Sequence, residues 1–253
     1  MRVLFFVFVY LLCIQTAQAK DFDQSHKIWD TLLKKYVTSE GLVAYKEFQK
    51  DNVLLEQYLG SLSQVSEEEY KSFTKSEKLA FLINAYNAFT IRLILDHYPV
   101  KSISDIGGPL PLLNLARGAP WKKNFFSLLG ETRNLDWIEH QKLRKDFSEP
   151  RIHFAIVCAS LGCPLLKGEA YTGKQMEIQL KTAKLSFLRD PKKNSYDSKK
   201  NILYLSKIFD WFKEDFTKQS TLIEFIQEGF EEKIKIDALV EFNEYSWKLN
   251  EKK

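Results

Sequence analysis

The run of residues 79–95 constrains the fold more than any other part of the sequence. Thr74 and Glu77, just before it, have the spacing of a capping box, which marks the start of a helix. The run is then apolar nearly all round until Tyr98-Pro99 ends it. A helix that is apolar on every side is buried on every side. The sequence therefore predicts a central helix around which the other elements pack.

Other segments alternate between helical and strand-like patterns. Helical spacing is predicted for residues 22–36, 54–62, 173–190 and 209–230, and a short helix is predicted from Asp136. Strands are predicted for residues 125–128, 132–135, 152–157, 202–205 and 240–249, of which the first two form a hairpin around residues 129–131. Residues 100–120 are predicted as an irregular loop that is long enough to be functional or mobile. We see no internal repeat and no composition break. We therefore predict a helix-rich α+β fold with a central, mostly antiparallel sheet, formed by residues 20–253 as a single domain.

The first nineteen residues have the pattern of a secretory signal peptide. Arg2 is followed by twelve apolar residues, 3–14, and by Ala17-Gln18-Ala19, an A-x-A cleavage site. Twelve residues are too few to span a bilayer, which needs about 20. A lipoprotein signal through Cys13 is the alternative, but Leu12 stands where a small residue is expected. We expect cleavage after Ala19, a periplasmic or secreted chain, and no stable membrane insertion afterwards.

Composition excludes several classes of function. The 37 Lys+Arg and 33 Asp+Glu residues leave a net charge of +4 without a long basic block, so we expect no nucleic-acid partner. Ten Gly and seven Pro are too few for long flexible linkers or low-complexity tracts. With 45% hydrophobic and 28% charged residues, the composition is that of a soluble globular protein and not of a disordered one.

Residue types that perform chemistry are densest between positions 136 and 163. Cys158 provides a nucleophile, His153 an imidazole that can hold its thiolate, and Glu139 an acid that can orient the ring. Positions 153 and 158 face opposite sides of a straight strand, so Cys158 must lie past the strand end. Asn84, on the central helix, can stabilise an oxyanion or orient the histidine.

Each of these residues also has a structural interpretation. Glu139 can complete a capping box with Asp136, and His153 can be a core histidine with its hydrogen bonds satisfied. His140 leaves a helix about 100° away from Glu139, so we do not expect both to face one site, and we place His140 beside the site or at the surface. For Asn87 we favour a role in tying down nearby loop backbone.

Cys163 opens two further alternatives. In an oxidising compartment it can form a disulfide with Cys158, which would abolish thiolate chemistry. Together with the nearby histidines and Glu139, the two cysteines can also bind zinc. However, no CxxC, HxxxH or HExxH spacing is present, so we expect no metal and no other cofactor.

Three motifs resemble one known family. They are residues 79–91 (LAFLINAYNAFTI), Ile138-Glu139-His140 and residues 151–164 (RIHFAIVCASLGCP), and they resemble the domain-of-unknown-function family 547 over roughly residues 29–230. One departure is Leu82, where bacterial members usually carry Trp. The resemblance implies a rearranged papain-like and transglutaminase-like thiol-enzyme fold. It also implies a triad of a cysteine, a histidine and an acidic residue, carried over onto Cys158, His153 and Glu139, with Asn84 nearby and Cys163 as the second cysteine. It names no substrate.

We therefore expect an exported cysteine-dependent hydrolase or acyl/amide transferase. Cys158 would attack an amide, ester or thioester carbonyl of a peptide-like or cell-envelope small substrate, and His153 would protonate the leaving group. The alternative is a non-catalytic envelope binding module that holds a peptide or cell-wall fragment in a cleft lined by residues 100–120. A reactive thiol in the cleft would distinguish the two.

Overall fold

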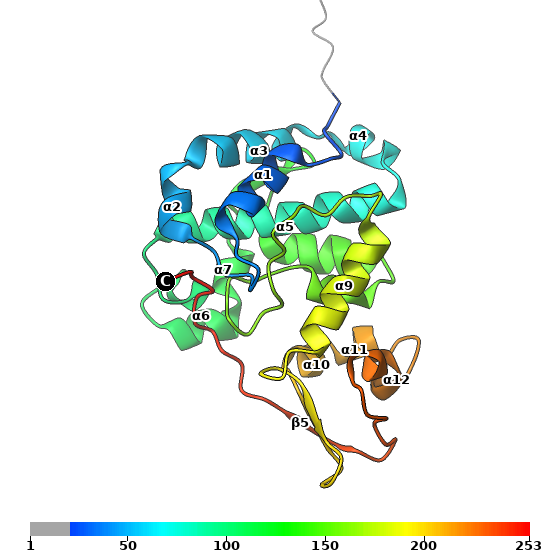
Figure 1. Ribbon diagram of the computed structural model, residues 1–253. Coiled ribbons are helices and arrows are strands. Elements are labelled where there is room, and N and C mark those ends of the chain that lie inside the picture. Colours follow the sequence, from blue (N-terminus) through cyan, green and yellow to red (C-terminus); the bar gives the residue numbers. More distant parts are fainter. Residues whose placement is uncertain (1–20) are drawn as a thin grey trace, which may run out of the picture.

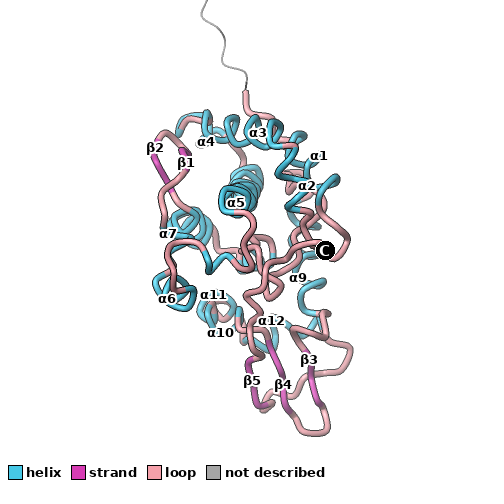
Figure 2. Tube along the Cα trace, turned by 90° about the vertical axis from the view of Figure 1, so that its left-hand side faces the viewer, coloured by secondary structure: helices cyan, strands magenta, loops and turns pink. Residues whose placement is uncertain are grey.

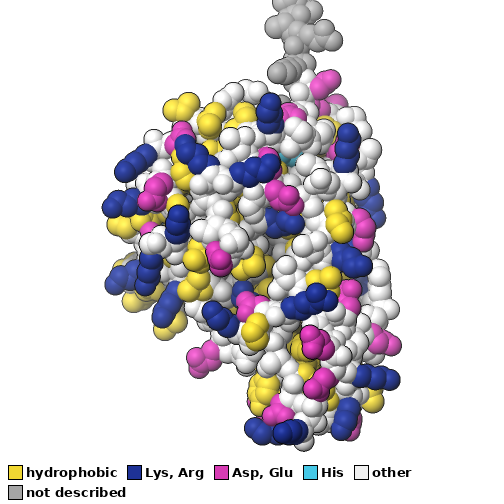
Figure 3. Space-filling model, viewed as in Figure 1, with side chains coloured by type: hydrophobic (Ala, Val, Ile, Leu, Met, Phe, Trp, Pro, Cys, Tyr) yellow, Lys and Arg dark blue, Asp and Glu magenta, His cyan; other side chains and the backbone are white. Residues whose placement is uncertain are grey.

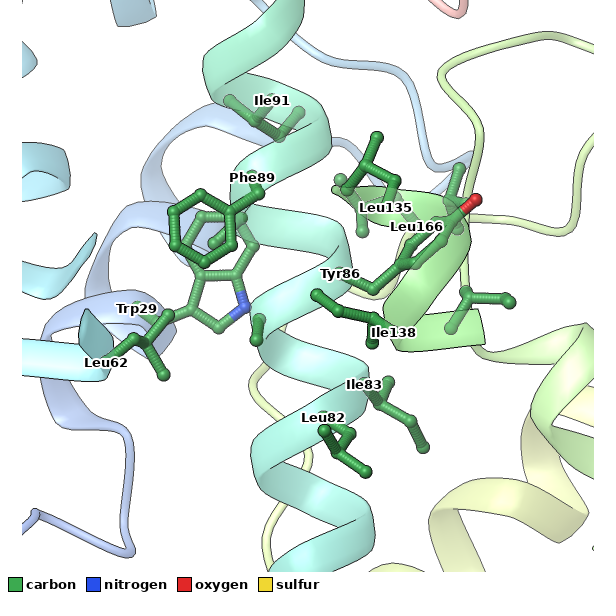
Figure 4. Close-up of a cluster of buried hydrophobic side chains, with 14 of the residues drawn as sticks. Trp29, Leu62, Leu82, Ile83, Tyr86, Phe89, Ile91, Leu135, Ile138 and Leu166 are labelled. Carbon is green, nitrogen blue, oxygen red and sulfur yellow. The ribbon is translucent and has the colours of Figure 1, made fainter. Parts of the chain in front are cut away.

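The central helix is α5 (Lys75–His97), and helices surround it in the computed structural model, which describes residues 21–253 (Figures 1 and 2). The predicted signal peptide and its cleavage site lie outside the described residues. The capping box of Thr74 and Glu77 forms as expected. Figure 4 shows Trp29 and Leu62 packed on one side of α5 and Ile138 on the other. The prediction of a buried central helix is confirmed.

The described elements follow one another along the chain in this order: α1 (Lys27–Tyr36), α2 (Tyr45–Lys50), α3 (Asn52–Gln64), α4 (Glu67–Ser72), α5, the 3₁₀ turn η1 (Ile103–Asp105), α6 (Pro111–Arg117), α7 (Ala119–Lys122), β1 (Phe126–Leu128), β2 (Glu131–Arg133), the π-helix η2 (Trp137–Leu143), α8 (Arg144–Asp146), the 3₁₀ helix η3 (Pro150–Phe154), α9 (Met176–Leu188), β3 (Ser195–Asp197), β4 (Ile202–Leu205), α10 (Ile208–Trp211), α11 (Lys213–Phe216), α12 (Leu222–Ile226), η4 (Gln227–Gly229) and β5 (Leu239–Phe242).

Helix α5 also has the length and hydropathy of a membrane span. Its most apolar window is 89% buried inside the protein, however, and among the described residues no other helix passes the same test. Burial by neighbouring helices gives the apolar surface of α5 the environment that lipid would otherwise provide. The helix is therefore the core helix of this fold.

The protein is mixed α+β and helix-rich, but the expected central sheet is wrong. Strands β1 and β2 form an isolated antiparallel hairpin, and β3, β4 and β5 form a separate small sheet in which β4 and β5 are parallel. The β3–β5 sheet lies away from α5 (Figure 2), whereas the hairpin packs at its side, where Phe126 of β1 stacks on Phe89 with 3.8 Å between ring centroids. The apolar centre that a sheet would have occupied is filled by α5 and the helices packed against it, α3, α9 and η2.

The predicted buried strand at residues 152–157 is also wrong. Pro150 begins the 3₁₀ helix η3, where the side chain of Glu149 caps the turn by accepting from the N–H of Arg151. The chain then continues as a loop through Cys158. The run is apolar because it lies between two hydrophobic clusters: Ile152 packs around α5, and Phe154 packs with α9 to α12.

The segment of residues 100–120 is more ordered than the predicted irregular loop. It contains η1, α6 and α7, and helix α6 begins with Pro111 in its first turn. The predicted last strand, residues 240–249, is shortened to β5. Beyond β5 the chain runs extended back across the protein, and its end returns to the α5 side, where Asn250 bonds the N-terminal part of the chain.

Candidate functional site

One cavity of about 360 Å³ collects most of the residues that the sequence singles out. Its polar lining includes Glu139, His140, His153, Cys158 and Cys163. Much of the remaining wall is aromatic and comes from Tyr86, Trp121, Trp211, Phe212, Tyr245 and Trp247. A concave, mostly apolar cavity with a few converging polar groups is the usual form of a small-molecule site.

His153 is held in this cavity by a carboxylate that the sequence analysis did not consider. Its Nε2 lies 2.7 Å from Oδ2 of Asp215, in α11, and its ring stacks on Phe212 with 4.0 Å between centroids. Arg144 holds the same carboxylate with two N–H groups, Nε at 2.6 Å and Nη2 at 3.2 Å. Arg144 therefore fixes the Asp215 carboxylate, and the carboxylate together with the Phe212 ring fixes the plane of the imidazole.

This arrangement sets the protonation of the histidine. The side chain of His153 is almost completely buried, and burial lowers the pKa of its imidazole, although the hydrogen bond to Asp215 opposes the shift. The bonds from His153 and Arg144 hold the pKa of the Asp215 carboxyl well below its usual range, against the effect of burial. A neutral ring that donates from Nε2 to Asp215 keeps a lone pair on Nδ1, and that atom can accept a proton.

Glu139 and His140 both line the cavity, which corrects the expectation that they could not face one site. The segment Trp137–Leu143 is a π-helix and not an α-helix, so consecutive side chains lie closer together around its axis than the predicted 100°. Nη1 of Arg144 donates to Nδ1 of His140 at 2.8 Å, which leaves the His140 proton on Nε2. Burial lowers the pKa of His140, in agreement with a neutral ring.

The predicted role of Glu139 in orienting His153 is wrong, because Asp215 has that position. Glu139 instead accepts a hydrogen bond from the hydroxyl of Tyr86, with 3.3 Å between oxygens. The capping-box interpretation also fails, since the Asp136 side chain makes no cap hydrogen bond. Glu139 is 8% exposed, and this burial raises the pKa of its carboxyl to about 7. Glu139 is therefore a buried acid of the cavity wall that can be neutral near pH 7.

Cys158 lies on the cavity wall and is paired with Cys163 as a disulfide, with 6.2 Å between Cα atoms. This is the disulfide alternative considered from the sequence. The Cys158 sulfur also lies 3.2 Å from the hydroxyl of Tyr245 and 3.3 Å from that of Ser160. Among the described residues, no hydrogen bond joins Cys158 to His153, so the two share a cavity without the contact expected of a thiolate–imidazolium pair.

Asn87 fixes the loop that leads to Cys158. Its Nδ2 donates to the carbonyl of Ala155 at 2.9 Å, and its Oδ1 accepts from the N–H of Val157 at 2.9 Å. The amide thus replaces the ladder partners that a strand would have had, which explains how an apolar run can be buried here without a sheet. The predicted role of Asn87 in tying down loop backbone is confirmed.

Asn84 fixes loop backbone in the same way, but at Tyr171. Its Nδ2 donates to the carbonyl of Tyr171 at 2.7 Å, and its Oδ1 accepts from the N–H of Tyr171 at 3.0 Å. Both ends of the amide are occupied by backbone, and the residue does not line the cavity. The prediction that Asn84 stabilises an oxyanion or orients His153 is therefore wrong.

The chain beyond β5 closes the cavity with Tyr245 and Trp247. Its backbone is fastened next to the cysteine pair, because Gly162 donates its N–H to the carbonyl of Ser246 at 2.9 Å. A Cβ atom at Gly162 would lie 2.8 Å from the Tyr245 ring, so glycine is needed for this approach. Trp247 then links Trp121 and Trp211 into one aromatic wall, with 6.0 and 5.8 Å between ring centroids.

The sequence analysis missed Asp215, Arg144 and Tyr245. Asp215 lies in a helical, charge-rich stretch in which a solvated acid looks the same as a buried partner, and Tyr245 lies in a segment predicted as a strand. For Arg144 the only signal is its spacing of four residues from His140. Among residues 21–253, no group of three or more His, Cys, Asp or Glu side chains is arranged to hold a metal ion.

Fold and site together define a helix-rich α+β protein whose cavity is lined by a pair of cysteines and by a buried histidine that is bonded to the half-buried Asp215. Residues 70–188 match the family model described as "Protein of unknown function, DUF547", so this part of the chain is similar to that family. The match confirms the resemblance over a narrower span than residues 29–230. Asp215 and Tyr245 lie outside it. No curated protein and no solved structure matches the chain.

Proposed function

We propose that this protein is a cysteine-dependent hydrolase or acyl/amide transferase that becomes active when the bond between Cys158 and Cys163 is reduced. The observation that carries the proposal is His153, which lines the same cavity as Cys158 and whose Nε2 bonds to Asp215 outside the cavity lining. A base oriented by a fixed acid beside a potential nucleophile is the general arrangement of triad enzymes. The acid of this triad is Asp215, in place of Glu139.

Reduction by an external dithiol, such as a thiol–disulfide oxidoreductase, has to come first. The dithiol gives two hydrogens to the cysteine pair and leaves as its own disulfide. The Cys158 thiol then transfers its proton to His153 and attacks the substrate carbonyl. The imidazolium, stabilised by Asp215, returns the proton to the leaving amine, alcohol or thiol, and water or an acceptor amine releases the acyl group.

We further propose an exported protein, processed after Ala19, that acts on a peptide-like or cell-envelope small substrate and is distantly related to papain-like and transglutaminase-like thiol enzymes. The cavity volume supports a small substrate, since pockets for such ligands measure about 300–1,000 Å³. The aromatic wall of Trp121, Trp211 and Trp247 supports apolar contacts to the part of the substrate that does not react.

Alkylation tests the proposal. After reduction, an iodoacetamide probe followed by peptide mapping should label Cys158 faster than Cys163 at neutral pH, and not label it before reduction. His153→Ala and Asp215→Asn should each slow this labelling about tenfold, because both remove the stabilisation of the thiolate. Asp210→Asn, an acid on the neighbouring helix α10, is the matched control and should label like the wild type. Equal labelling of Cys158 in all four proteins would refute the thiol mechanism.

Tyr245 is predicted to support the thiolate. Burial raises the pKa of its phenol, so the hydroxyl stays protonated and can donate to the Cys158 sulfur 3.2 Å away. Tyr245→Phe keeps the ring against Gly162 and removes only the donor. After reduction, we expect the midpoint of the pH profile of Cys158 alkylation to rise by about one pH unit. A merely structural role for Tyr245 would leave this midpoint unchanged.

A second candidate is a non-catalytic binding module, favoured by the disulfide and the aromatic wall. In that case Cys158 stays unreactive toward iodoacetamide after reduction. A candidate ligand, such as a peptide or cell-wall fragment, would change the fluorescence of the three wall tryptophans in the oxidised protein. The two candidates therefore differ in which redox form is functional.

A further inference from the structure

Helix α6 buries a polar side chain and exposes apolar ones, which is the reverse of an ordinary surface helix. Asn114 is its buried residue, and the Asn114 amide donates to the carbonyls of Ser104 and Gly108 at 2.9 and 3.0 Å. Three leucines at its start point outward: Leu112 is 84% exposed, Leu110, the residue before the helix, is 59% exposed, and Leu113 is 38% exposed. Because the amide fixes the helix in this orientation, the apolar side chains are held in solvent and not turned into the core.

Cationic side chains accompany these leucines. Between residues 101 and 124 the chain carries Lys101, Arg117, Lys122 and Lys123 against the single acid Asp105, a net charge of +3. Asp105 is already engaged, since its carboxylate accepts from the backbone N–H groups of Lys101 and Ser102. In Figure 3, hydrophobic and Lys or Arg side chains lie together along the left-hand edge, where Figure 1 places α6.

Tryptophans lie next to this surface. Helix α6 contributes Leu115 and Ala116 to the cavity lining, which also contains Trp121, Trp211 and Trp247. Trp211 is 45% exposed. Leucines that project from a protein edge, flanked by Lys and Arg and by tryptophans with an exposed face, have the composition of a surface that lies in a membrane interface.

We propose that α6 docks the protein peripherally on an anionic lipid bilayer, with Leu110, Leu112 and Leu113 entering the interface. The charge favours this occupant over a second copy of the chain, because a symmetric contact through α6 would bring two segments of net charge +3 together. Helix α6 lies at the edge of the molecule in both Figure 1 and Figure 2, so a flat partner such as a bilayer can reach it. The surface is continuous with the cavity lining through Leu115 and Ala116, so docking brings the cavity close to the bilayer.

Vesicle co-sedimentation tests the docking without any activity measurement. Wild-type protein should bind vesicles of phosphatidylcholine mixed with phosphatidylglycerol, bind vesicles of phosphatidylcholine alone much more weakly, and lose binding at high salt. Leu112→Ser should weaken binding about tenfold, because one large apolar side chain is removed from the interface. Ile178→Ser, which changes an equally apolar and 61% exposed side chain on α9, is the matched control and should bind like the wild type.

A second pair of variants tests the charge. Lys123→Gln should weaken binding about fivefold, and Lys199→Gln, in the turn between β3 and β4, should not change it. All proteins share the same N-terminus, so differences between variants report on the substituted positions. Three results would overturn the proposal: no binding of the wild type to anionic vesicles, equal binding of Leu112→Ser and Ile178→Ser, or a dimer without vesicles that Leu112→Ser dissociates, which would make a second copy the partner.

Discussion

Asn87→Ala is expected to lower the free energy of unfolding by about 3 kcal/mol and to slow the alkylation of reduced Cys158. The substitution leaves the carbonyl of Ala155 and the N–H of Val157 buried without partners, and each such group costs about 1–3 kcal/mol. The loop that carries Cys158 also loses its anchor. Denaturant unfolding gives the first quantity, and labelling with iodoacetamide after reduction gives the second.

Asn84→Ala separates stability from positioning. Like Asn87→Ala, it removes one hydrogen bond to a backbone carbonyl and one from a backbone N–H. Both of these backbone groups belong to Tyr171, which does not line the cavity. We expect a similar loss of stability and unchanged labelling of Cys158 in the fraction that remains folded. If both variants slowed labelling equally, the effect would come from general loosening of the fold, and the positioning role of Asn87 would be refuted.

Glu139→Gln is expected to stabilise the protein by about 3 kcal/mol at pH 8 and by less than about 1 kcal/mol at pH 5. Burial raises the pKa of the Glu139 carboxyl from its ordinary value near 4.5 to about 7. Between these values the unfolded chain has released its proton while the folded protein keeps it, so stability falls as the pH rises. Above pH 7 the folded protein carries the full cost of a buried charge, which glutamine avoids while still accepting the bond from Tyr86.

Thermal unfolding at the two pH values measures this difference. At pH 8 the melting temperature of Glu139→Gln should exceed that of the wild type by roughly 8 °C, and at pH 5 the two should nearly coincide. Glu214→Gln, which changes an exposed acid on α11, is the control and should show no such dependence on pH. If Glu139→Gln changed the melting temperature equally at both pH values, the protonation of Glu139 would not change between pH 5 and pH 8, and the raised pKa would be refuted.

Local patterns in the sequence predicted the central helix and the hairpin correctly. Apolarity around the whole helix and the capping box of Thr74 and Glu77 act within a few residues of one another, and the structure contains both. The hairpin of β1 and β2 follows from the strand-like runs on each side of Leu129-Gly130, both of which adopt positive φ. Such features depend on neighbours in the chain, and tertiary packing does not alter them.

The apolar run before Cys158 shows where local patterns fail. A central strand and a loop that is buried between two hydrophobic clusters both have apolar, β-branched sequences. The sequence pattern therefore does not distinguish one from the other. The difference lies in which groups satisfy the backbone. Here the amide of Asn87, almost seventy residues earlier, takes the place of a neighbouring strand. No periodicity within residues 152–157 reports on that partner.

The sequence by itself determined the central helix and the presence of a cysteine pair, a histidine and an acid near one another in the chain. Only the tertiary structure decided that Asp215, 62 residues after His153, holds the imidazole, and that Tyr245, 87 residues after Cys158, contacts the sulfur. It also decided that Glu139 is a buried acid bonded to Tyr86. The physical reason is that a buried polar group takes its partner from whichever segment packs against it, and packing of distant segments leaves no periodic signal in the chain.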